Sequence, residues 1–190
     1  MAPKLSILLP GLEKRAIFRQ ILDSLLVKQT NNQTEVIQFI DNGEISIGVK
    51  RQRMLEKATG DYIVFIDDDD LVSHNYVSLI LGGLKDSPDC IGIHLLHYQD
   101  SWLLGKTYHS IKFSHWWEEP DKKRGEGMLF YRNPNHLNPV RRDIALKVGF
   151  PDLTLGEDRH YSMGILPFLN TEVYIEEPIY FYHERAKKVI

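Results

Sequence analysis

Cysteine is nearly absent from this chain, and its single copy, Cys90, limits what the protein can be. One cysteine cannot form an internal disulfide, and it leaves too little sulfur for a cysteine-based zinc site. The disulfide-rich class of small secreted domains is therefore excluded, and a reducing compartment is favoured.

Long apolar runs and an excess of one charge are also missing. The apolar run Leu5–Leu9 is too short for a signal peptide or for a membrane span, which needs about 20 residues. We expect a soluble, cytoplasmic protein without membrane insertion. The formal net charge of −3 argues against a protein built to coat nucleic acid. Basic residues still cluster at Lys50–Arg53, Lys122–Arg124 and Arg141–Arg142, and such clusters can meet a phosphate.

Strand and helix patterns alternate through the first half of the chain. The predicted strands are Leu5–Leu9 with a turn at Pro10-Gly11, Val36–Ile40, Tyr62–Ile66 and Ile91–Leu96. The predicted helices are Ile17–Leu26, Val49–Thr59 with Gly60 at its C-cap, and Tyr76–Leu84. This alternation predicts a single α/β domain over residues 1–190, with a mostly parallel central sheet flanked by helices. No internal repeat or linker interrupts it.

The second half has a weaker pattern. Residues 101–138 are rich in aromatic side chains and histidine without a clear period, so we expect irregular structure with short strands at most. Helices are predicted over Arg141–Val148 and Glu157–Ile165. Short strands are predicted over Val173–Ile175 and Ile179–Tyr182, on either side of Pro178.

The most informative feature is a run of four carboxylates, Asp67–Asp70, directly after a buried strand. Four like charges within one turn repel one another, so a cation is their natural companion. Every ligand in the run is oxygen, which favours a hard cation, Mg²⁺ or Mn²⁺. Because parallel strands end at one edge of the sheet, we expect Pro10, Asp41 and Asp67 to share one ligand there. A solvated acidic loop is the alternative.

These residues carry a resemblance that extends over nearly the whole chain. Four segments hold it, namely Leu5–Pro10, Glu35–Gly43, Arg51–Asp70 with the pattern Arg-x6-Ala-x-Gly-Asp-Tyr-Ile-x-Phe-Ile-Asp-Asp-Asp-Asp, and Pro139–Asp158. In this order they resemble the family 2 nucleotide-sugar glycosyltransferases with the GT-A fold, whose DXD motif falls in the third segment. The compact size and the segment Asn135–Pro139 look like the small single-domain enzymes of bacteriophages and large DNA viruses, for which the compartment would be the host cytoplasm.

The resemblance implies a metal-dependent enzyme that moves a hexose from a UDP-sugar to an acceptor hydroxyl. Residues 1–98 would form the nucleotide-sugar-binding half and residues 99–190 the acceptor-binding half. Mn²⁺ or Mg²⁺ would bridge the diphosphate and stabilise the leaving group. A glycan, a protein and a hydroxymethylated DNA base all remain open as the acceptor, and we expect a monomer or weak dimer.

The resemblance assigns roles within the acidic run. Asp69 is the main metal ligand, joined by Asp67, which alternatively contacts the ribose or a metal-bound water. Asp68 belongs to the nucleotide-binding loop and is expected to face solvent. Asp70 would order the loop or cap the following helix. His183 would touch the metal or the diphosphate, with a plain surface histidine as the alternative.

Other residues would contact the nucleotide or the acceptor. Pro10 and Gly11 would border the nucleotide. By resemblance, Asp41 would accept a hydrogen bond from uracil N3–H; its alternative role is to form the turn before Asn42-Gly43. Arg51 would reach the base or a phosphate oxygen, and its alternative is a surface position on a helix.

Gly156-Glu157-Asp158 would complete the site. In the resembled family, the Asp of a Glu-Asp pair takes the proton from the acceptor hydroxyl as that oxygen attacks the anomeric carbon. Asp158 is therefore the predicted general base of an inverting reaction, and Glu157 would contact an acceptor hydroxyl. The alternative is simple helix-end charge, because the helix dipole favours acidic residues in a first turn.

Three positions depart from the family pattern. Gly11-Leu12-Glu13 replaces the usual Thr-aromatic-Asn after Pro10, which leaves the identity of the nucleotide open. Gln52 stands where Asn is common, and Asn42 stands where a second Asp is usual. None of these changes removes a catalytic group.

Two alternatives come from other classes. A haloacid-dehalogenase-type phosphohydrolase could use Asp68–Val72 as its Asp-x-Asp-x-Val motif, but that class has its nucleophile on the first strand and needs a later Gly-Asp-x-x-x-Asp, which Gly156–Tyr161 does not match. A non-catalytic nucleotide-sugar or nucleic-acid binding module would have no need to retain Asp67, Asp69 and Asp158 together.

Overall fold

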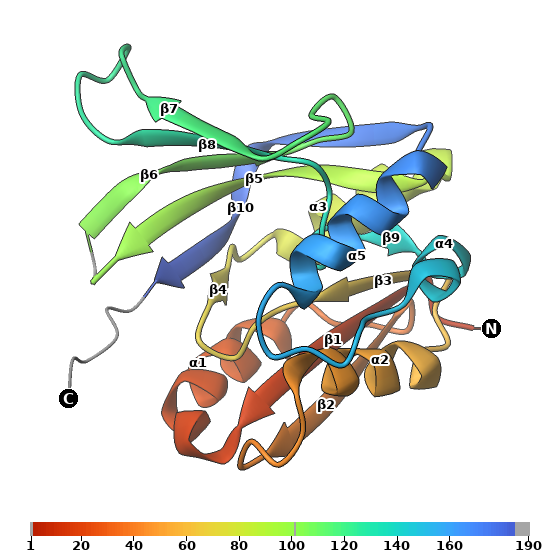
Figure 1. The fold of residues 1–190 in the computed structure, drawn as a ribbon. Helices are drawn as coiled ribbons and strands as arrows, with labels where there is room; N and C mark the ends of the chain where they lie inside the picture. Colours follow the sequence, from red (N-terminus) through yellow and green to blue (C-terminus); the bar gives the residue numbers. More distant parts are fainter. Residues whose placement is uncertain (1, 101, 185–190) are drawn as a thin grey trace.

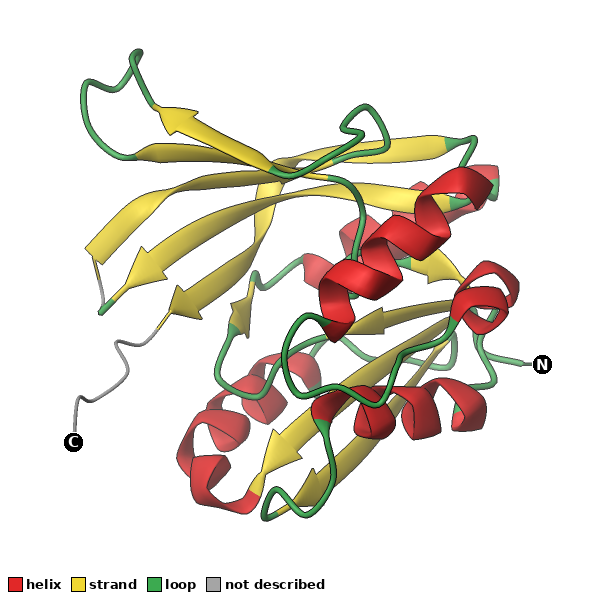
Figure 2. Ribbon diagram, viewed as in Figure 1, coloured by secondary structure: helices red, strands yellow, loops and turns green. Residues whose placement is uncertain are grey.

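The computed structural model describes residues 2–100 and 102–184, which form one mixed sheet with helices on both faces of its parallel part (Figures 1 and 2). The strands are β1 (Leu5–Leu12), β2 (Thr34–Asp41), β3 (Tyr62–Phe65), β4 (Leu71–Val72), β5 (Cys90–Gln99), β6 (Trp102–His109), β7 (Trp117–Pro120), β8 (Met128–Arg132), β9 (Val140–Arg141) and β10 (Glu172–Glu184). The α-helices are α1 (Ala16–Leu26), α2 (Ile47–Lys57), α3 (Tyr76–Gly83), α4 (Arg142–Val148) and α5 (Glu157–Ile165). Three short 3-10 turns are η1 (Glu13–Arg15), η2 (Leu84–Asp86) and η3 (Leu166–Phe168).

The strand order explains why the first strand is apolar throughout. The order is β2-β1-β3-β9-β5-β6-β8-β7, with β10 beside β5 and β4 beside β10, and β1 runs parallel to both of its neighbours. Leu5, Ile7 and Leu9 pack into a core with α1 and α3, whereas Leu8 packs into a second core with α2, α4 and α5. Burial on both faces removes the alternation of an exposed strand. The predicted α/β architecture, with a mostly parallel central sheet flanked by helices, is confirmed.

Two local predictions in this half are wrong. The turn expected at Pro10-Gly11 is absent, because β1 continues to Leu12 in parallel register with β2. The register with β3 ends at Leu8, so only β2 pairs with β1 around Pro10, and a residue without N–H is tolerated there. Gly60 does not cap α2, whose C-cap is Ala58. Glycine is needed there for close approach, since a Cβ at that position would lie 2.6 Å from the Ser6 Oγ.

The second half contains more strand than expected. Residues 101–138 were expected to be irregular, but they supply β6, β7 and β8, and β10 is one strand of 13 residues instead of two short ones. Pro178 is accommodated where the register between β10 and β5 shifts. The strands were hidden because polar and aromatic side chains occupy both of their faces, so no hydrophobic period of two appears. No helix in the described part of the chain has the length and apolar character needed to cross a membrane.

Candidate active site

Arg51 joins the acidic run to the second pair of carboxylates. Its guanidinium donates through Nη2 to Asp67 Oδ1 at 2.7 Å and through Nη1 to Glu157 Oε1, and the residue is only 3% exposed. The alternative of a surface arginine is therefore wrong. A second contact to Asp67 comes from His136, whose Nε2 lies 3.4 Å from Oδ2. Burial alone would raise the pKa of Asp67, but the Arg51 charge and the His136 contact hold it well below its usual range.

Asp68 is not a solvent-facing residue, which corrects the prediction. It is 2% exposed, and both of its oxygens accept hydrogen bonds at 2.8 Å, Oδ2 from the Leu12 N–H and Oδ1 from Arg15 Nη1. Arg15 Nη1 also lies 3.1 Å from Asp69 Oδ2, so one guanidinium serves two carboxylates. Sequence reasoning missed Arg15. The available signal was its position just after β1, at the sheet edge where ligands collect.

Asp70 ties the acidic run to β10. It is 1% exposed and accepts hydrogen bonds from the Tyr180 hydroxyl at 2.7 Å and from the His183 N–H at 2.8 Å. Burial and the nearby charge of Asp67 raise the pKa of Asp70 well above its usual range. Two roles were predicted for Asp70, and the structure confirms the first, which is to order the loop. It does not cap α3, whose N-cap residue is Asn75.

A cavity of about 1170 Å³ opens at the carboxyl ends of β1 and β3. It brings together the predicted residues Pro10, Gly11, Arg51, Asp67, Asp68, Asp69 and His183, together with Arg15 and Lys50. Glycine at position 11 keeps the wall open, because a Cβ there would lie 2.8 Å from the Ile40 side chain and 3.0 Å from Asp68 Oδ2. Five carboxylates, namely Glu44, Asp67, Asp68, Asp69 and Glu184, line the cavity beside these three cationic side chains, so a divalent cation bound here would offset the excess negative charge and let an anionic ligand bind.

Asp69 and His183 are the residues in this cavity best suited to hold a cation. The Asp69 side chain is 17% exposed, and the buried Nδ1 of His183 has no hydrogen-bond partner in the described part of the chain. The His183 ring stacks on Tyr98 with the ring centres 5.3 Å apart. Across residues 2–100 and 102–184, no three His, Cys, Asp or Glu side chains are grouped to hold a metal ion. Mg²⁺-type sites commonly use one or two protein ligands plus substrate phosphates, so this donor set fits such an ion.

Asp41 lies behind Lys50 and does not line the cavity. Its Oδ1 accepts from Lys50 Nζ at 2.6 Å and from the Gly43 N–H at 3.0 Å, which confirms the turn-forming role. Lys50 Nζ also donates to the Gly11 carbonyl at 2.7 Å, so it links β1 to β2. Burial opposes the effect, but Lys50 and the turn N–H hold the pKa of Asp41 below its usual range. Asp41 Oδ2 is buried without a partner among the described residues.

A second cavity of about 340 Å³ adjoins the first, and Arg51 and Asp67 line both. Glu157 and Asp158 line the second cavity but not the first. Glu157 is buried against Arg51, whereas Asp158 is half-buried and its Oδ1 accepts from the Arg159 N–H at 2.7 Å. The two cavities therefore meet at the charged pair, with the strand-end carboxylates on one side and Asp158 on the other.

The loop before α5 is positioned by close contact with α2. Ser46 caps α2 by accepting from the Val49 N–H at 3.1 Å, and the Gly48 N–H donates to the Leu153 carbonyl at 3.0 Å. A Cβ at Gly48 would lie 1.9 Å from the Pro151 carbonyl oxygen, so only glycine allows this approach. The contact sets where the chain enters α5, and hence where Asp158 lies.

Sequence reasoning also missed part of the second cavity. His109, Arg132 and His136 line it, and they come from β6, β8 and the segment between β8 and β9. His109 donates through Nδ1 to Asn138 Oδ1 at 2.9 Å, and burial lowers its pKa to about 3, so it is neutral. No local signal could find these residues, because they come together only through the pairing of distant strands.

Comparison with known proteins places these observations in a family. The model of the family described as Glycosyl transferase family 2 matches residues 18–141, about two thirds of the chain. EpsH of Bacillus subtilis (strain 168) is 25% identical over 168 residues, which are 84% of this chain and 47% of that protein. The glucosyl-dolichyl phosphate glucuronosyltransferase of Haloferax volcanii is 25% identical over 137 residues, which are 70% of this chain and 44% of that protein. The chain thus spans about half the length of the curated relatives it matches.

Solved structures share the fold. TarS residues 1–349 of S. aureus in complex with UDP-GlcNAc has a TM-score of 0.70 at 14% identity, covering 97% of this chain and 60% of that one. The mannosyltransferase PcManGT of Pyrobaculum calidifontis in complex with GDP-Man and Mn²⁺ has a TM-score of 0.62 at 12% identity, covering 100% of this chain and 59% of that one. At this level of identity the likeness establishes the GT-A architecture.

Proposed function

We propose, from the premise that this chain belongs to glycosyl transferase family 2 and is a glycosyltransferase, that it transfers a hexose from a UDP-sugar to an acceptor hydroxyl with a divalent cation. The observation that carries the proposal is the junction of two cavities at Arg51 and Asp67. One cavity has the charges to hold a nucleoside diphosphate, and the other has an accessible carboxylate, Asp158. Membership of this family argues against the phosphohydrolase, which has another fold.

The larger cavity is the proposed donor site. Pro10 and Gly11 border the nucleotide, and Arg15, Lys50 and Arg51 face the negative diphosphate. The bound UDP-GlcNAc of TarS supports a UDP-sugar, whereas PcManGT carries GDP-Man, so the base is the point that most needs a test. Asp41 remains the proposed acceptor for uracil N3–H by resemblance to the family; because it lies outside the cavity and is paired with Lys50, this role requires the Lys50 side chain to move when UDP binds.

Asp69 and His183 are the proposed protein ligands for Mn²⁺ or Mg²⁺, with diphosphate oxygens completing the coordination. The chemistry that such a cation supplies is neutralisation of negative charge on the departing diphosphate. Arg51 and His136 each contact one oxygen of Asp67, so Asp67 is less suited than Asp69 to bind the metal directly. Asp67 is therefore proposed to accept a hydrogen bond from a ribose hydroxyl. The Mn²⁺ in the PcManGT complex supports a divalent cation as the cofactor.

Asp158 is the proposed general base of an inverting transfer. The acceptor oxygen forms a bond to the anomeric carbon, the bond from that carbon to the diphosphate oxygen breaks, and the bonding electrons leave with UDP. The acceptor proton passes to an oxygen of Asp158. A carboxylate is basic enough, because the proton is lost late, when the attacking oxygen is already acidic. Glu157 acts by holding Arg51 in place between the cavities.

Calorimetry with UDP, CDP and GDP, each with and without Mn²⁺, tests the donor and the cation together. We expect wild-type protein to bind UDP most tightly and to do so only with Mn²⁺ present. Asp69→Ala should lose the Mn²⁺-dependent part, while Asp86→Ala, which removes an exposed carboxylate outside the cavities, should behave as wild type. Equal affinity for UDP and GDP would reject the UDP-sugar donor. Undiminished Mn²⁺-dependent binding in Asp69→Ala would reject the ligand assignment.

A further inference from the structure

The sheet that carries the second cavity has a second hollow on its opposite face. In β6, Thr107 and His109 line the active-site cavity, whereas Lys106 and Tyr108 line a separate cleft of about 850 Å³. Successive side chains of a strand point to opposite faces, so the two hollows lie back to back. Among the described residues, no helix covers the outer face of β6, β8 and β7 (Figures 1 and 2).

Aromatic rings form a continuous ladder across this outer face. Cross-strand neighbours stack in series from β5 to β7, with ring centres 4.8 Å apart for His94 and Tyr108, 5.7 Å for Tyr108 and Tyr131, and 4.6 Å for Tyr131 and Trp117. Each ring partly covers its neighbour's face, so the ladder presents mainly ring edges and hydroxyl groups to a ligand. The Tyr131 hydroxyl donates to Glu119 Oε1 at 3.0 Å, whereas the Tyr108 hydroxyl has no partner within the described residues.

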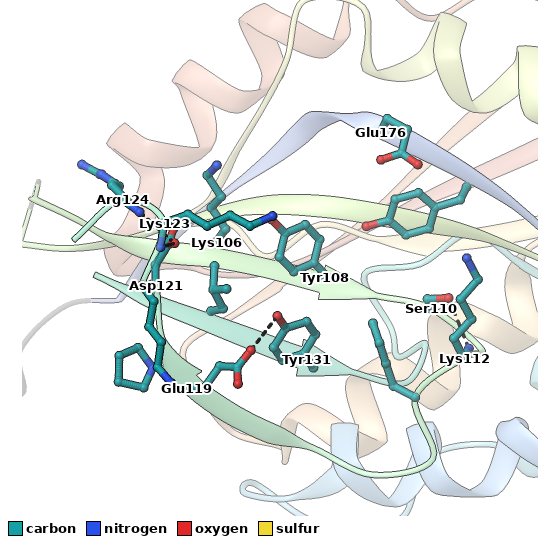
Figure 3. Close-up of a pocket in the computed structure, with 15 residues that line it drawn as sticks. Lys106, Tyr108, Ser110, Lys112, Glu119, Asp121, Lys123, Arg124, Tyr131 and Glu176 are labelled. Carbon is teal, nitrogen blue, oxygen red and sulfur yellow. Dashed lines mark hydrogen bonds between the residues drawn. The ribbon is translucent and has the colours of Figure 1, made fainter. Parts of the chain in front are cut away.

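Positive charges border the ladder at both ends. Figure 3 shows Lys106, Lys123 and Arg124 at one end of the cleft and Lys112 at the other, with Tyr108 and Tyr131 between them. Four lysines line the cleft, Lys106, Lys112, Lys122 and Lys123. Within the described part of the chain, none of them forms an ion pair with a carboxylate. This local excess of positive charge occurs in a protein whose net charge is −3.

The loop that carries three of these cations is held in shape. Asp121 is buried, and its Oδ1 accepts from the N–H groups of Lys123 and Arg124, each at 3.1 Å. The Gly125 N–H donates to the Asp121 carbonyl at 3.0 Å, and φ of Gly125 is +80°. Five cationic side chains line the cleft against three carboxylates, Glu119, Asp121 and Glu176, so the lining keeps an excess of positive charge. A preorganised cationic loop loses little conformational freedom when it binds an anion.

We propose that this outer cleft binds an anionic carbohydrate chain, with phosphate or carboxylate groups on its sugars, and so retains a polymeric acceptor near the active site. The assignment rests on the proposed transfer to an acceptor hydroxyl. Charges at both ends of the cleft require a ligand longer than one sugar unit. Tyrosine hydroxyls suit sugar hydroxyls, and the positive edges of the rings suit the oxygens of carboxylate or phosphate groups. Single-stranded nucleic acid needs free aromatic faces for base stacking, and here neighbouring rings occupy those faces.

The test measures binding of two anionic probes, decagalacturonate and a phosphomannan oligosaccharide, against neutral maltodecaose. We expect at least one anionic probe to bind and the neutral chain not to bind. The double variant Lys122→Glu/Lys123→Glu should weaken that binding about tenfold or more, since two surface charges are reversed. Tyr108→Phe should weaken it less, because only one hydroxyl is lost. The matched control Lys28→Glu/Lys85→Glu makes the same charge change at exposed sites outside the cleft.

Three results would overturn the proposal. Both anionic probes could fail to bind at millimolar concentration, or the control variant could lose as much probe affinity as Lys122→Glu/Lys123→Glu. The third result is that a dT12 oligonucleotide or phosphatidylglycerol vesicles bind at the same lysines more tightly than the anionic carbohydrates do. UDP affinity is measured in the same samples and should not change in Lys122→Glu/Lys123→Glu. If wild-type protein does not bind UDP, the proposed donor is wrong; if it binds UDP but neither anionic probe, only the outer-cleft proposal is wrong.

Discussion

In the parallel half of the sheet, Asp67 and Glu157 share the buried guanidinium of Arg51, and Asp68 is held by Arg15. On the outer face of β6, β8 and β7, by contrast, the lysines of the cleft have no carboxylate partner within the described residues. A charge removed from water must be paired, whereas a charge at the surface is stabilised by solvent. The first region is therefore rigid before any ligand arrives, and the second keeps its charges available for a ligand.

Asp158 differs from the paired carboxylates Asp67, Asp68 and Glu157. Among the contacts of residues 2–100 and 102–184, its carboxylate accepts a hydrogen bond only from the Arg159 N–H. We expect Asp158→Asn to lower the rate of sugar transfer by about 10² to 10⁴, since the amide cannot take a proton. Donor affinity should stay within a few fold. Parallel measurements of turnover and of UDP-sugar binding check this. Near wild-type turnover would move the base to Glu157, and loss of donor binding would make Asp158 a nucleotide ligand.

Arg51→Gln breaks the pairing directly. Two carboxylates lose a buried partner, so the free energy of unfolding should fall by about 3 to 5 kcal/mol at pH 7. Arg53→Gln, on the exposed side of the same helix, should change it little. Urea unfolding of both variants gives the comparison, and equal stability of the two would mean that Arg51 does not stabilise the site.

The same variant should change the pH dependence of stability. In wild type the pKa of Asp67 is depressed, so its contribution is complete above the unfolded-state pKa of about 3.9 and is lost as the pH falls below it. Without Arg51, burial raises that pKa, and the folded state takes up a proton more readily than the unfolded chain. The stability gap between Arg51→Gln and wild type should therefore narrow between pH 7 and pH 4. A constant gap would contradict the pairing as its cause.

Asp41→Ala tests two interactions together, the ion pair with Lys50 and the proposed hydrogen bond from uracil N3–H. Loss of one charge-assisted hydrogen bond should weaken UDP by about ten- to a hundredfold, or roughly 1.5 to 3 kcal/mol. Asp41→Asn keeps an acceptor oxygen and offers an amide donor, so it should bind CDP better relative to UDP than wild type does. If wild-type protein already binds UDP and CDP equally, the uracil-reading role is wrong. Unfolding measurements separate this effect from the loss of a partner for buried Lys50.

Gly48→Ala sharpens the comparison through backbone packing alone. The added methyl would overlap the Pro151 carbonyl, so we expect a loss of about 1 to 3 kcal/mol in stability. Transfer should fall with it, because the loop that leads to Asp158 must shift. Gly82→Ala is the matched control, since open space surrounds that helical position and alanine is the better helix former. Equal thermal stability of Gly48→Ala and Gly82→Ala would show that the loop yields without cost.

Local pattern was sufficient for the type and order of the main elements in the parallel half, although it misplaced the end of β1 and the cap of α2. Apolar periodicity predicts its helices and strands, because each side chain there is buried or exposed according to its place in a regular element. The acidic run after the strand Tyr62–Phe65 predicts a site at the sheet edge, because parallel strands end together. The pattern of β6, β7 and β8 failed for the opposite reason, since both faces of these strands carry polar and aromatic side chains that serve two hollows.

The sequence by itself determined the element order of the parallel half, the edge at which the carboxylates gather and the family to which their spacing belongs. Only the tertiary structure decided which charges neutralise one another. Arg51 and Glu157 are 106 residues apart, and Arg15 and Asp68 are 53 apart. Pairing over such separations depends on where strands and loops meet in space. Local periodicity carries no information about those meetings, so the burial of Asp68 and the unpaired lysines of the outer face emerged only from the fold.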